Sequence, residues 1–242
     1  MVQSRFAISL VLGAALSAGA AGAQEPGTGW TVAVGGGAIA APSYPGSGSY
    51  RIIPVPFLDL RYGNRFFASP LGTGINFVAE RQLRLGVSVA PDLGRGADSV
   101  RGLAGIGPAA DVKLFAVVGA GPVGVLADVR HQLGGADGTL VDAGLTTTLP
   151  ALPGLLVSAT GLVTWADRQY MRSYFGSGPG PFAAGEGLRD ASLALMAYYR
   201  FDEHWGAQAL ARASLLLGDA AASPVTEHRL QPAVGGFVTY KL

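Results

Sequence analysis

Apolar and polar residues alternate with a period of two over several segments of about ten residues, and this pattern constrains the fold more than any other feature of the chain. In residues 123–130, Val125 and Val129 fall on one face of an extended strand, and Asp128 and Arg130 fall on the other. The same alternation returns in residues 111–118, 141–149 and 189–201. Successive side chains of a strand point to opposite faces, so the pattern predicts an all-β protein.

The length and composition of these segments favour strands that cross a membrane. They match the roughly 9–11 residues of a tilted transmembrane strand and exceed the usual soluble strand of about 5–6. The chain is 49% hydrophobic and 14% charged, against about 25% charged in an average protein. Aromatic residues fall near the segment ends, as in an interfacial girdle: Trp30, Tyr62, Trp165, Phe201, Trp205 and Tyr240. We therefore expect a transmembrane antiparallel up-and-down β-barrel, with a soluble β-sandwich as the alternative.

The spacing of the segments predicts about twelve strands. We place them near residues 30–39, 50–61, 65–69, 72–79, 83–91, 108–119, 122–132, 139–149, 154–165, 188–201, 204–217 and 229–242. Residues 65–82 are also compatible with one strand in place of two. The even number matches bacterial barrels, and the connections alternate between short turns and long Gly- and Pro-rich loops. We expect the short turns and both termini in the periplasm, and the long loops outside.

The first 23 residues have the parts of a secretory signal peptide. Arg5 precedes an apolar run from Phe6 to Leu16, and small residues end in Ala21-Gly22-Ala23. This predicts a signal peptide over residues 1–23 and an outer-membrane barrel domain over 24–242, with an uncleaved membrane anchor as the alternative. The expected location is the cell outer membrane.

Charge and cysteine content exclude other classes. Arg5 is the only charged residue before residue 24, so the mature chain has 16 Lys and Arg (17 minus 1) against 16 Asp and Glu. This balance argues against a nucleic-acid partner, which would require a clustered basic surface. The chain contains no cysteine, so a core or the membrane lipid must stabilise it.

Most strand charges are expected to point into the lumen, because an Arg or Lys facing lipid costs about 2–4 kcal/mol near the midplane. The predicted lumen-facing charges are Arg51, Asp59, Arg61, Arg84, Asp111, Lys113, Asp128, Arg130, Asp142, Asp190, Arg200, Arg212 and Lys241. They form either a salt-bridged plug or the lining of a small aqueous path. Balanced signs on neighbouring strands favour the plug.

No motif predicts catalysis, a metal or a cofactor. The three histidines, His131, His204 and His228, have no Ser or Asp at a recognisable catalytic spacing, and no Gly-x-Ser-x-Gly occurs. Without cysteine or paired histidines, a metal site has no support. We therefore predict that the protein is not an enzyme and binds no cofactor.

Several stretches resemble the MipA/OmpV family. They are residues 44–51 (Tyr-Pro-Gly-Ser-Gly-Ser-Tyr-Arg), 54–56 (Pro-Val-Pro), 61–69 (Arg-Tyr-Gly-Asn-Arg-Phe-Phe-Ala-Ser), 164–176 around Trp165, and 216–224 around Leu216 and Pro224. The likeness covers essentially all of the mature chain. The compact 92–107 segment and the terminal Leu242 depart from the family pattern.

The resemblance implies an outer-membrane barrel that acts as a scaffold. Its named member links a lytic transglycosylase to a penicillin-binding protein and so coordinates peptidoglycan cutting and synthesis. The short periplasmic turns leave a partner on that side little surface to contact. The alternatives are a surface antigen or adhesin, a small-solute channel, and a lipid hydrolase that would use His131 as its base.

Overall fold

The computed structural model describes residues 29–70, 72–80, 82–96, 104–120, 122–176 and 180–242. Its strands are β1 (Trp30–Pro42), β2 (Tyr50–Tyr62), β3 (Phe66–Ser69), β4 (Gly72–Ala79), β5 (Leu83–Asp92), β6 (Ala109–Ala120), β7 (Val123–Gly134), β8 (Thr139–Leu152), β9 (Leu155–Ala166), β10 (Gly187–Arg200), β11 (Trp205–Leu216) and β12 (Leu230–Lys241). Two short helices, α1 (Arg168–Phe175) and α2 (Gly218–Ala222), lie between them. Within the described ranges, no helix is long and apolar enough to cross a membrane.

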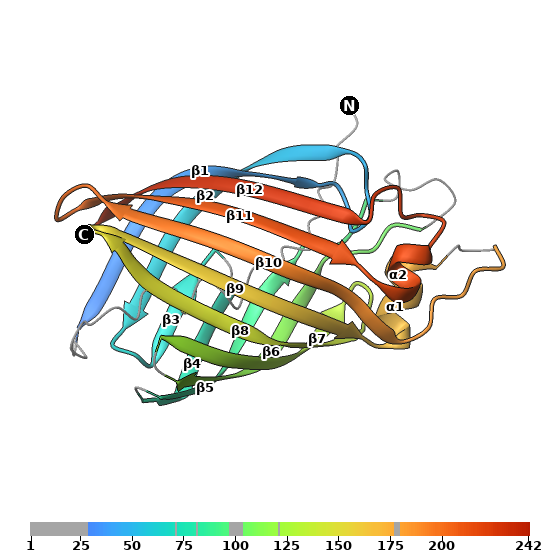
Figure 1. Cartoon of the computed structure of the whole chain (residues 1–242), viewed down its shortest axis with the longest axis horizontal. Helices are drawn as coiled ribbons and strands as arrows, with labels where there is room; N and C mark the ends of the chain where they lie inside the picture. The colour runs from blue at the N-terminus through green and yellow to red at the C-terminus, as the bar shows by residue number, and fades with distance from the viewer. Residues whose placement is uncertain (1–28, 71, 81, 97–103, 121, 177–179) are drawn as a thin grey trace.

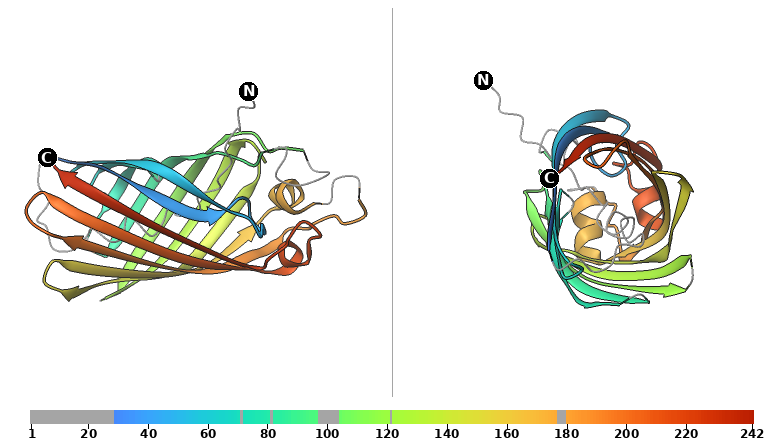
Figure 2. Two further views of the ribbon diagram at one scale, coloured as in Figure 1. Left: turned by 90° about the horizontal axis from the view of Figure 1, so that it is seen from above. Right: turned by 90° about the vertical axis from the view of Figure 1, so that its left-hand side faces the viewer.

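The strands form one closed barrel (Figures 1 and 2). Each strand pairs antiparallel with its neighbour in sequence, and β1 pairs with β12 from Ala33↔Lys241 to Ala40↔Val234. Where neighbouring strands are fully paired, closure leaves no free sheet edge. The hydrocarbon core of a membrane requires this pairing, because it offers no water to backbone N–H and C=O groups. The predicted twelve-strand up-and-down barrel is confirmed. The predicted signal peptide lies outside the described residues.

The two ends of the barrel differ, and we call them the turn end and the loop end. The turn end holds Trp30, the end of β12 and the short connections that include residues 63–65 and 201–204. The loop end holds the long connections, with both helices (Figure 1). The expected alternation of short and long connections is therefore present.

The two faces of the strands differ as the alternation predicts. In β7, exposed and buried residues alternate from Val123 to Gln132. Large apolar side chains such as Ile52, Leu145 and Val234 are exposed on the outside of the barrel. Aromatic pairs such as Trp30–Tyr62 and Trp205–Tyr240 lie at the turn end. This outer surface suits lipid, with a rim of amphipathic rings at the interface.

The segment 65–82 forms two strands, β3 and β4, of which β3 is short. β3 pairs with β2 only from Leu60 to Tyr62, although β2 pairs with β1 along its whole length. From Tyr50 to Asp59, toward the loop end, the edge of β2 that faces away from β1 has no strand partner among the described residues.

Candidate functional site in the barrel lumen

Ion pairs join neighbouring strands on the inner face of β6, β7 and β8. Lys113 Nζ lies 3.6 Å from Asp128 Oδ2, and Arg130 Nη2 lies 3.4 Å from Asp142 Oδ2. All four side chains are nearly inaccessible to solvent. Buried charges persist only when partners offset the loss of hydration, so this part of the wall is a paired electrostatic layer.

A second group of charges continues the layer on β10 and β11. Arg189 donates through Nε to Asp190, whose other oxygen lies 3.8 Å from Arg212 Nη2. Arg189 also donates to the Tyr170 hydroxyl at 3.0 Å. The charged wall (Lys113, Asp128, Arg130, Asp142, Arg189, Asp190 and Arg212) therefore extends from β6 to β11 and contacts helix α1.

Arg189 was absent from the predicted lumen charges for a structural reason. Strict alternation places it on the face opposite Asp190, but the β9–β10 register shifts between Leu188 and Asp190. The resulting bulge buries both Arg189 and Asp190. A Gly-Leu-Arg-Asp run at a strand start carries no local signal of such a bulge.

The remaining predicted charges are less buried. Arg61 Nε donates to Asp59 at 2.8 Å, and Arg51, Arg84 and Asp111 are half-buried. Arg200 and Lys241 are exposed at the turn end. Sequence reasoning also missed Asp92, Arg95 and Gln132, which are buried near the loop end.

Helix α1 packs inside the loop end of the barrel, as the end-on view in Figure 2 shows. Its buried residues are Tyr170, Met171, Tyr174 and Phe175. They contact Leu140, Ala166, Leu216 and Ala220, so strands β8, β9 and β11 and helix α2 share one hydrophobic cluster with α1. The spacing of these four residues repeats after one helical turn, a signal that could have predicted the helix.

Hydrogen bonds from distant segments hold α1 in place. Asp167 caps its N-terminus by accepting from Tyr170 N at 2.8 Å and also accepts from Thr139 N at 2.8 Å. At the other end, Arg95 donates to the carbonyls of Tyr174 at 2.9 Å and Ser173 at 3.2 Å. These bonds satisfy groups that a helix end leaves unpaired.

Burial changes the acidity of the groups around α1. Burial raises the pKa of the Tyr170 hydroxyl above its ordinary value. Burial lowers the pKa of Arg95, against the opposing effect of Tyr174. The ordinary pKa values of both side chains lie well above neutral pH. A neutral phenol can accept from Arg189, and a charged guanidinium can donate to the helix carbonyls.

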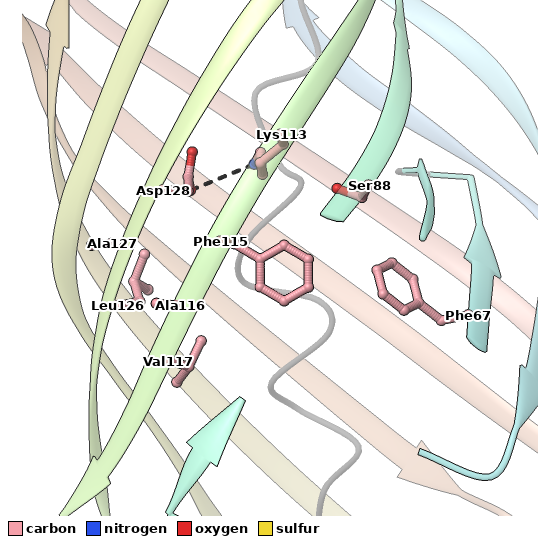
Figure 3. Close-up of a pocket in the computed structure, with 9 residues that line it drawn as sticks. All are labelled: Phe67, Ser88, Lys113, Phe115, Ala116, Val117, Leu126, Ala127 and Asp128. Carbon is pink, nitrogen blue, oxygen red and sulfur yellow. Dashed lines mark ion pairs between the residues drawn. The ribbon is translucent and has the colours of Figure 1, made fainter. Parts of the chain in front are cut away.

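A pocket lies on the inner wall next to the charged layer (Figure 3). Its lining includes Phe67, Ser88, Phe115, Val117 and Leu126, with Lys113 and Asp128 at one side. The ring centroids of Phe67 and Phe115 are 6.2 Å apart in an edge-to-face arrangement. Gly74 and Gly86 lie under these rings and leave the space that they fill.

The histidines lie outside this layer. His131 Nδ1 is 3.0 Å from Thr139 Oγ1 and its Nε2 is 3.6 Å from Asp137 Oδ1, on an exposed hairpin. His204 stacks on Tyr240 at the turn end, and His228 is exposed. Among the residues with described positions, no group of three His, Cys, Asp or Glu side chains is arranged to hold a metal ion.

Comparison with known proteins gives one family and a set of distant barrels. The family model described as MltA-interacting protein MipA matches residues 34–242. No curated protein matches the chain. Among solved structures, the chain is similar to OmpT, an outer membrane protein of Vibrio cholerae, at 8% identity over 77% of this chain and 64% of that chain, with a TM-score of 0.37.

Two further structures have similar values. OprD from Pseudomonas aeruginosa matches at 11% identity over 78% of this chain and 55% of that chain, with a TM-score of 0.38. The Pseudomonas putida toluene transporter TodX matches at 10% identity over 88% of both chains, with a TM-score of 0.34. This chain spans less than two thirds of the length of OmpT and OprD. At these scores, the likeness adds nothing to what the strand pairing shows.

Proposed function

The chain belongs to the MltA-interacting protein MipA family, and from that premise we propose that this outer-membrane β-barrel is a non-enzymatic scaffold that links a lytic transglycosylase to a peptidoglycan synthase. The family resemblance noted in the sequence and the outer-membrane location are confirmed. The proposed part of the function is the contact with the two enzymes and the coordination of cutting and synthesis of the cell wall.

The filled loop end is the observation in the barrel that supports a structural role. Helix α1 and the hydrophobic cluster around it occupy this end, and the charged wall lies beneath them. Paired charges and packed aromatic rings occupy the interior of a barrel and need no flow through it. This arrangement favours the plug over the aqueous path, and it supports a protein that works through contacts.

We place the partner contact at the turn end, which the sequence predicts to be periplasmic. The β10–β11 turn exposes Arg200, Asp202, Glu203 and His204 beside the rings of Phe201 and Trp205. Asp202 accepts from the backbone N–H groups of His204 at 2.8 Å and Trp205 at 2.7 Å, which gives the turn a defined shape. A rigid turn with mixed aromatic and charged groups is suited to a small protein contact.

Site-specific crosslinking in intact envelopes tests the scaffold. A photoreactive amino acid at Glu203 is expected to crosslink to a lytic transglycosylase or a penicillin-binding protein, detected with antibodies to each. The same group at Arg168, exposed at the loop end, is the matched control and is expected to crosslink to neither. If neither enzyme is crosslinked from Glu203 or from the other turns at this end, the scaffold proposal is wrong.

The absence of catalysis is also a proposal, and His131 offers its test. Its ring contacts Thr139 and Asp137, an acid–base–hydroxyl arrangement, but on an exposed hairpin whose ion pair is 3.6 Å long. We expect purified protein to hydrolyse phospholipid no faster than the His131→Ala variant. Activity above background that disappears in H131A would make the barrel an enzyme.

A surface antigen or adhesin is the second candidate function. It rests on the long connections at the loop end, where Arg168 and Glu186 are exposed and paired at 3.4 Å. Antibodies raised against residues 180–187 are expected to label intact cells if this end faces outward. Labelling only after the outer membrane is permeabilised would contradict this candidate.

A further inference from the structure

The pairing between β1 and β12, which we call the seam, closes the barrel and is interrupted near the loop end by two prolines (Figure 1). Leu242 N donates to Val32 O at 2.9 Å, so even-numbered residues of both strands direct their backbone groups toward the seam. In the same register, Pro42 lies opposite Pro232, and neither has an N–H group to donate. The observed strand pairing ends before this pair.

Beyond the prolines, the two loops resume contact through a clasp. We give this name to residues 44–48 together with Glu227, His228 and Gln231. His228 lies opposite Gly46 in the register of the seam, and its N–H donates to Gly46 O at 3.1 Å. Glu227 N donates to the same oxygen at 2.8 Å. The clasp therefore continues the register of β1 and β12 on the far side of the interruption.

Two side chains of the clasp bind the first loop. Gln231 Oε1 accepts from Gly46 N at 3.1 Å. The carboxylate of Glu227 accepts from the Tyr44 hydroxyl at 2.9 Å and from Gly48 N at 3.1 Å. Tyr44 and Gln231 are buried. Loss of a partner would leave buried polar groups without a hydrogen bond, so these contacts favour one arrangement of the two loops.

Gly46 has the backbone conformation that the clasp requires. Its φ is +96°, and a Cβ atom at this position would lie 2.8 Å from Thr226 Oγ1. Glycine adopts such a conformation without a steric penalty and lets the two loops approach closely. Gly46 belongs to residues 44–51, the first of the stretches that resemble the MipA/OmpV family. The proposed scaffold role does not account for this stretch, whereas the clasp does.

The seam itself specifies its register weakly. β1 and β12 are the first and last strands, so no short turn sets their register as it does in a hairpin. Residues 35–37 of β1 and 235–236 of β12 are all glycine, and few side chains meet across a glycine-rich pair. The ring of Phe237 lies over Gly37, and a slip of two residues would place it opposite Gly35, again a glycine.

We propose that the clasp sets the register in which β1 and β12 pair when the barrel closes. A slip of two residues keeps every side chain on its own face of the wall, so the alternation of the strands does not oppose it. The same slip moves the side chains of Glu227 and Gln231 by about 7 Å relative to the first loop. Their hydrogen bonds to that loop therefore form only in the observed register.

Pairs of cysteines across the seam test the register, because the chain has no cysteine of its own. Ala33→Cys with Lys241→Cys joins residues that face each other in the observed register. Ala33→Cys with Thr239→Cys joins residues that face each other only after the slip, and that are diagonal neighbours too far apart for a disulfide before it. Each pair is introduced into the full-length chain and assembled in the outer membrane of a Gram-negative host. Disulfides are measured after oxidation in the protein whose gel mobility shifts on heating.

With the clasp unchanged, we expect the first pair to form its disulfide and the second to form about tenfold less. The double variant Glu227→Ala, Gln231→Ala removes the side-chain bonds of the clasp, and it is expected to raise the slipped disulfide about tenfold at the expense of the observed one.

The matched control removes the same two types of side chain away from the clasp. It is Glu186→Ala, exposed at the loop end, with Gln208→Ala, half-buried on β11. The control should give the disulfides of the unchanged protein. If the folded double variant forms no more of the slipped disulfide than the control does, the clasp does not set the register.

A single substitution keeps the test decisive if the double variant does not assemble. Tyr44→Phe removes one hydroxyl from the clasp, and it is expected to raise the slipped disulfide about threefold, because one hydrogen bond of several is lost. Tyr50→Phe, which changes an exposed ring at the start of β2, is its control and should cause no rise. If both variants give the same low level of the slipped disulfide, the proposal is wrong.

Discussion

At the scale of single residues, glycine positions decide how closely strands β1 and β12 approach each other. A Cβ atom on Gly37 would meet the backbone oxygen of Gly236 and the ring of Phe237 across the β1–β12 pair. The Phe237 ring lies over this glycine and contacts Phe57 with 5.8 Å between ring centroids. An aromatic ring over a glycine fills the space that the missing side chain leaves. By contrast, a Cβ on Gly36 would meet nothing within 4 Å.

These two adjacent glycines give a paired prediction. Gly37→Ala is expected to lower the free energy of unfolding by about 1–3 kcal/mol, because the added methyl group must displace Phe237 or the β12 backbone. Gly36→Ala is the control and should change it by less than about 0.5 kcal/mol. Urea unfolding of the barrel in lipid measures both. Equal effects would show that this close approach does not limit stability.

The carboxylate of Asp202 gives a prediction about pH. Backbone N–H groups of Trp205 and then His204 donate to it and hold its pKa below the ordinary value. A lowered folded-state pKa means that the contribution is complete above the unfolded value of about 3.9 and is lost as the pH falls through the folded value. Amide protection of Trp205 should therefore be constant at neutral pH and fall only in acid.

Asp202→Asn is the control for this titration, because an amide oxygen still accepts hydrogen bonds but does not titrate. The acid-dependent loss of Trp205 amide protection should therefore be absent in D202N. Hydrogen exchange as a function of pH measures both proteins. Loss of protection near pH 6 in the unchanged protein would point to a different group.

At the scale of elements, helix α1 depends on contacts that it cannot make alone. It spans residues 168–175, too few for a stable isolated helix in water. Its stability therefore comes from the cap at Asp167, the carbonyl bonds from Arg95 and the burial of Tyr170, Met171, Tyr174 and Phe175. The helix and the barrel wall form one packed unit.

Removing the cap should loosen the helix and leave the barrel intact. Asp167→Ala is expected to cost about 1 kcal/mol locally, with the hydrogen bond from Thr139 N also lost. Faster hydrogen exchange in residues 168–175, with strand amides unchanged, is the expected result. Arg168→Ala, which changes an exposed neighbour, should leave the exchange unaltered. Faster exchange over the whole barrel would mean that the cap supports the wall as well.

At the scale of the whole molecule, the lumen has two different walls. Strands β6 to β11 carry the buried charges, and helix α1 packs against their loop end. Strands β1 to β5 and β12 contribute glycines, aromatic rings such as Phe57, Phe67 and Phe237, and few buried charges. The asymmetry places the packed core and most of the pocket lining on the charged side of the barrel, and the glycine- and aromatic-rich surface on the other side.

Conductance in planar bilayers tests whether this packing closes the barrel. We expect no steady current through the unchanged protein, because α1 and its cluster fill the loop end. A variant with residues 168–175 replaced by a Gly-Ser linker should show open steps while its gel mobility still shifts on heating. A steady current in the unchanged protein would favour the aqueous path.

The sequence predicted the architecture because its signals are local. Alternation in segments such as 123–130 identifies strands, since neighbouring side chains of a strand meet opposite environments regardless of distant contacts. The predicted strand bounds agree with the observed ones within a few residues. Residues 65–82, for which a single strand was the alternative, form the two strands β3 and β4. The amphipathic spacing in 168–175 was also present but was missed beside the stronger strand pattern.

By itself, the sequence determined that this chain forms an outer-membrane barrel of twelve strands with turns at one end and long loops at the other. Only the tertiary structure decided which charges pair, that a bulge buries Arg189 with Asp190, that Arg95 holds α1 from a distant loop, and that β3 pairs with β2 only from Leu60 to Tyr62. The physical reason is the separation along the sequence of the residues that establish each feature. Alternation depends on adjacent residues, whereas pairing across the lumen depends on register and helix placement, which residues far apart in the chain establish together.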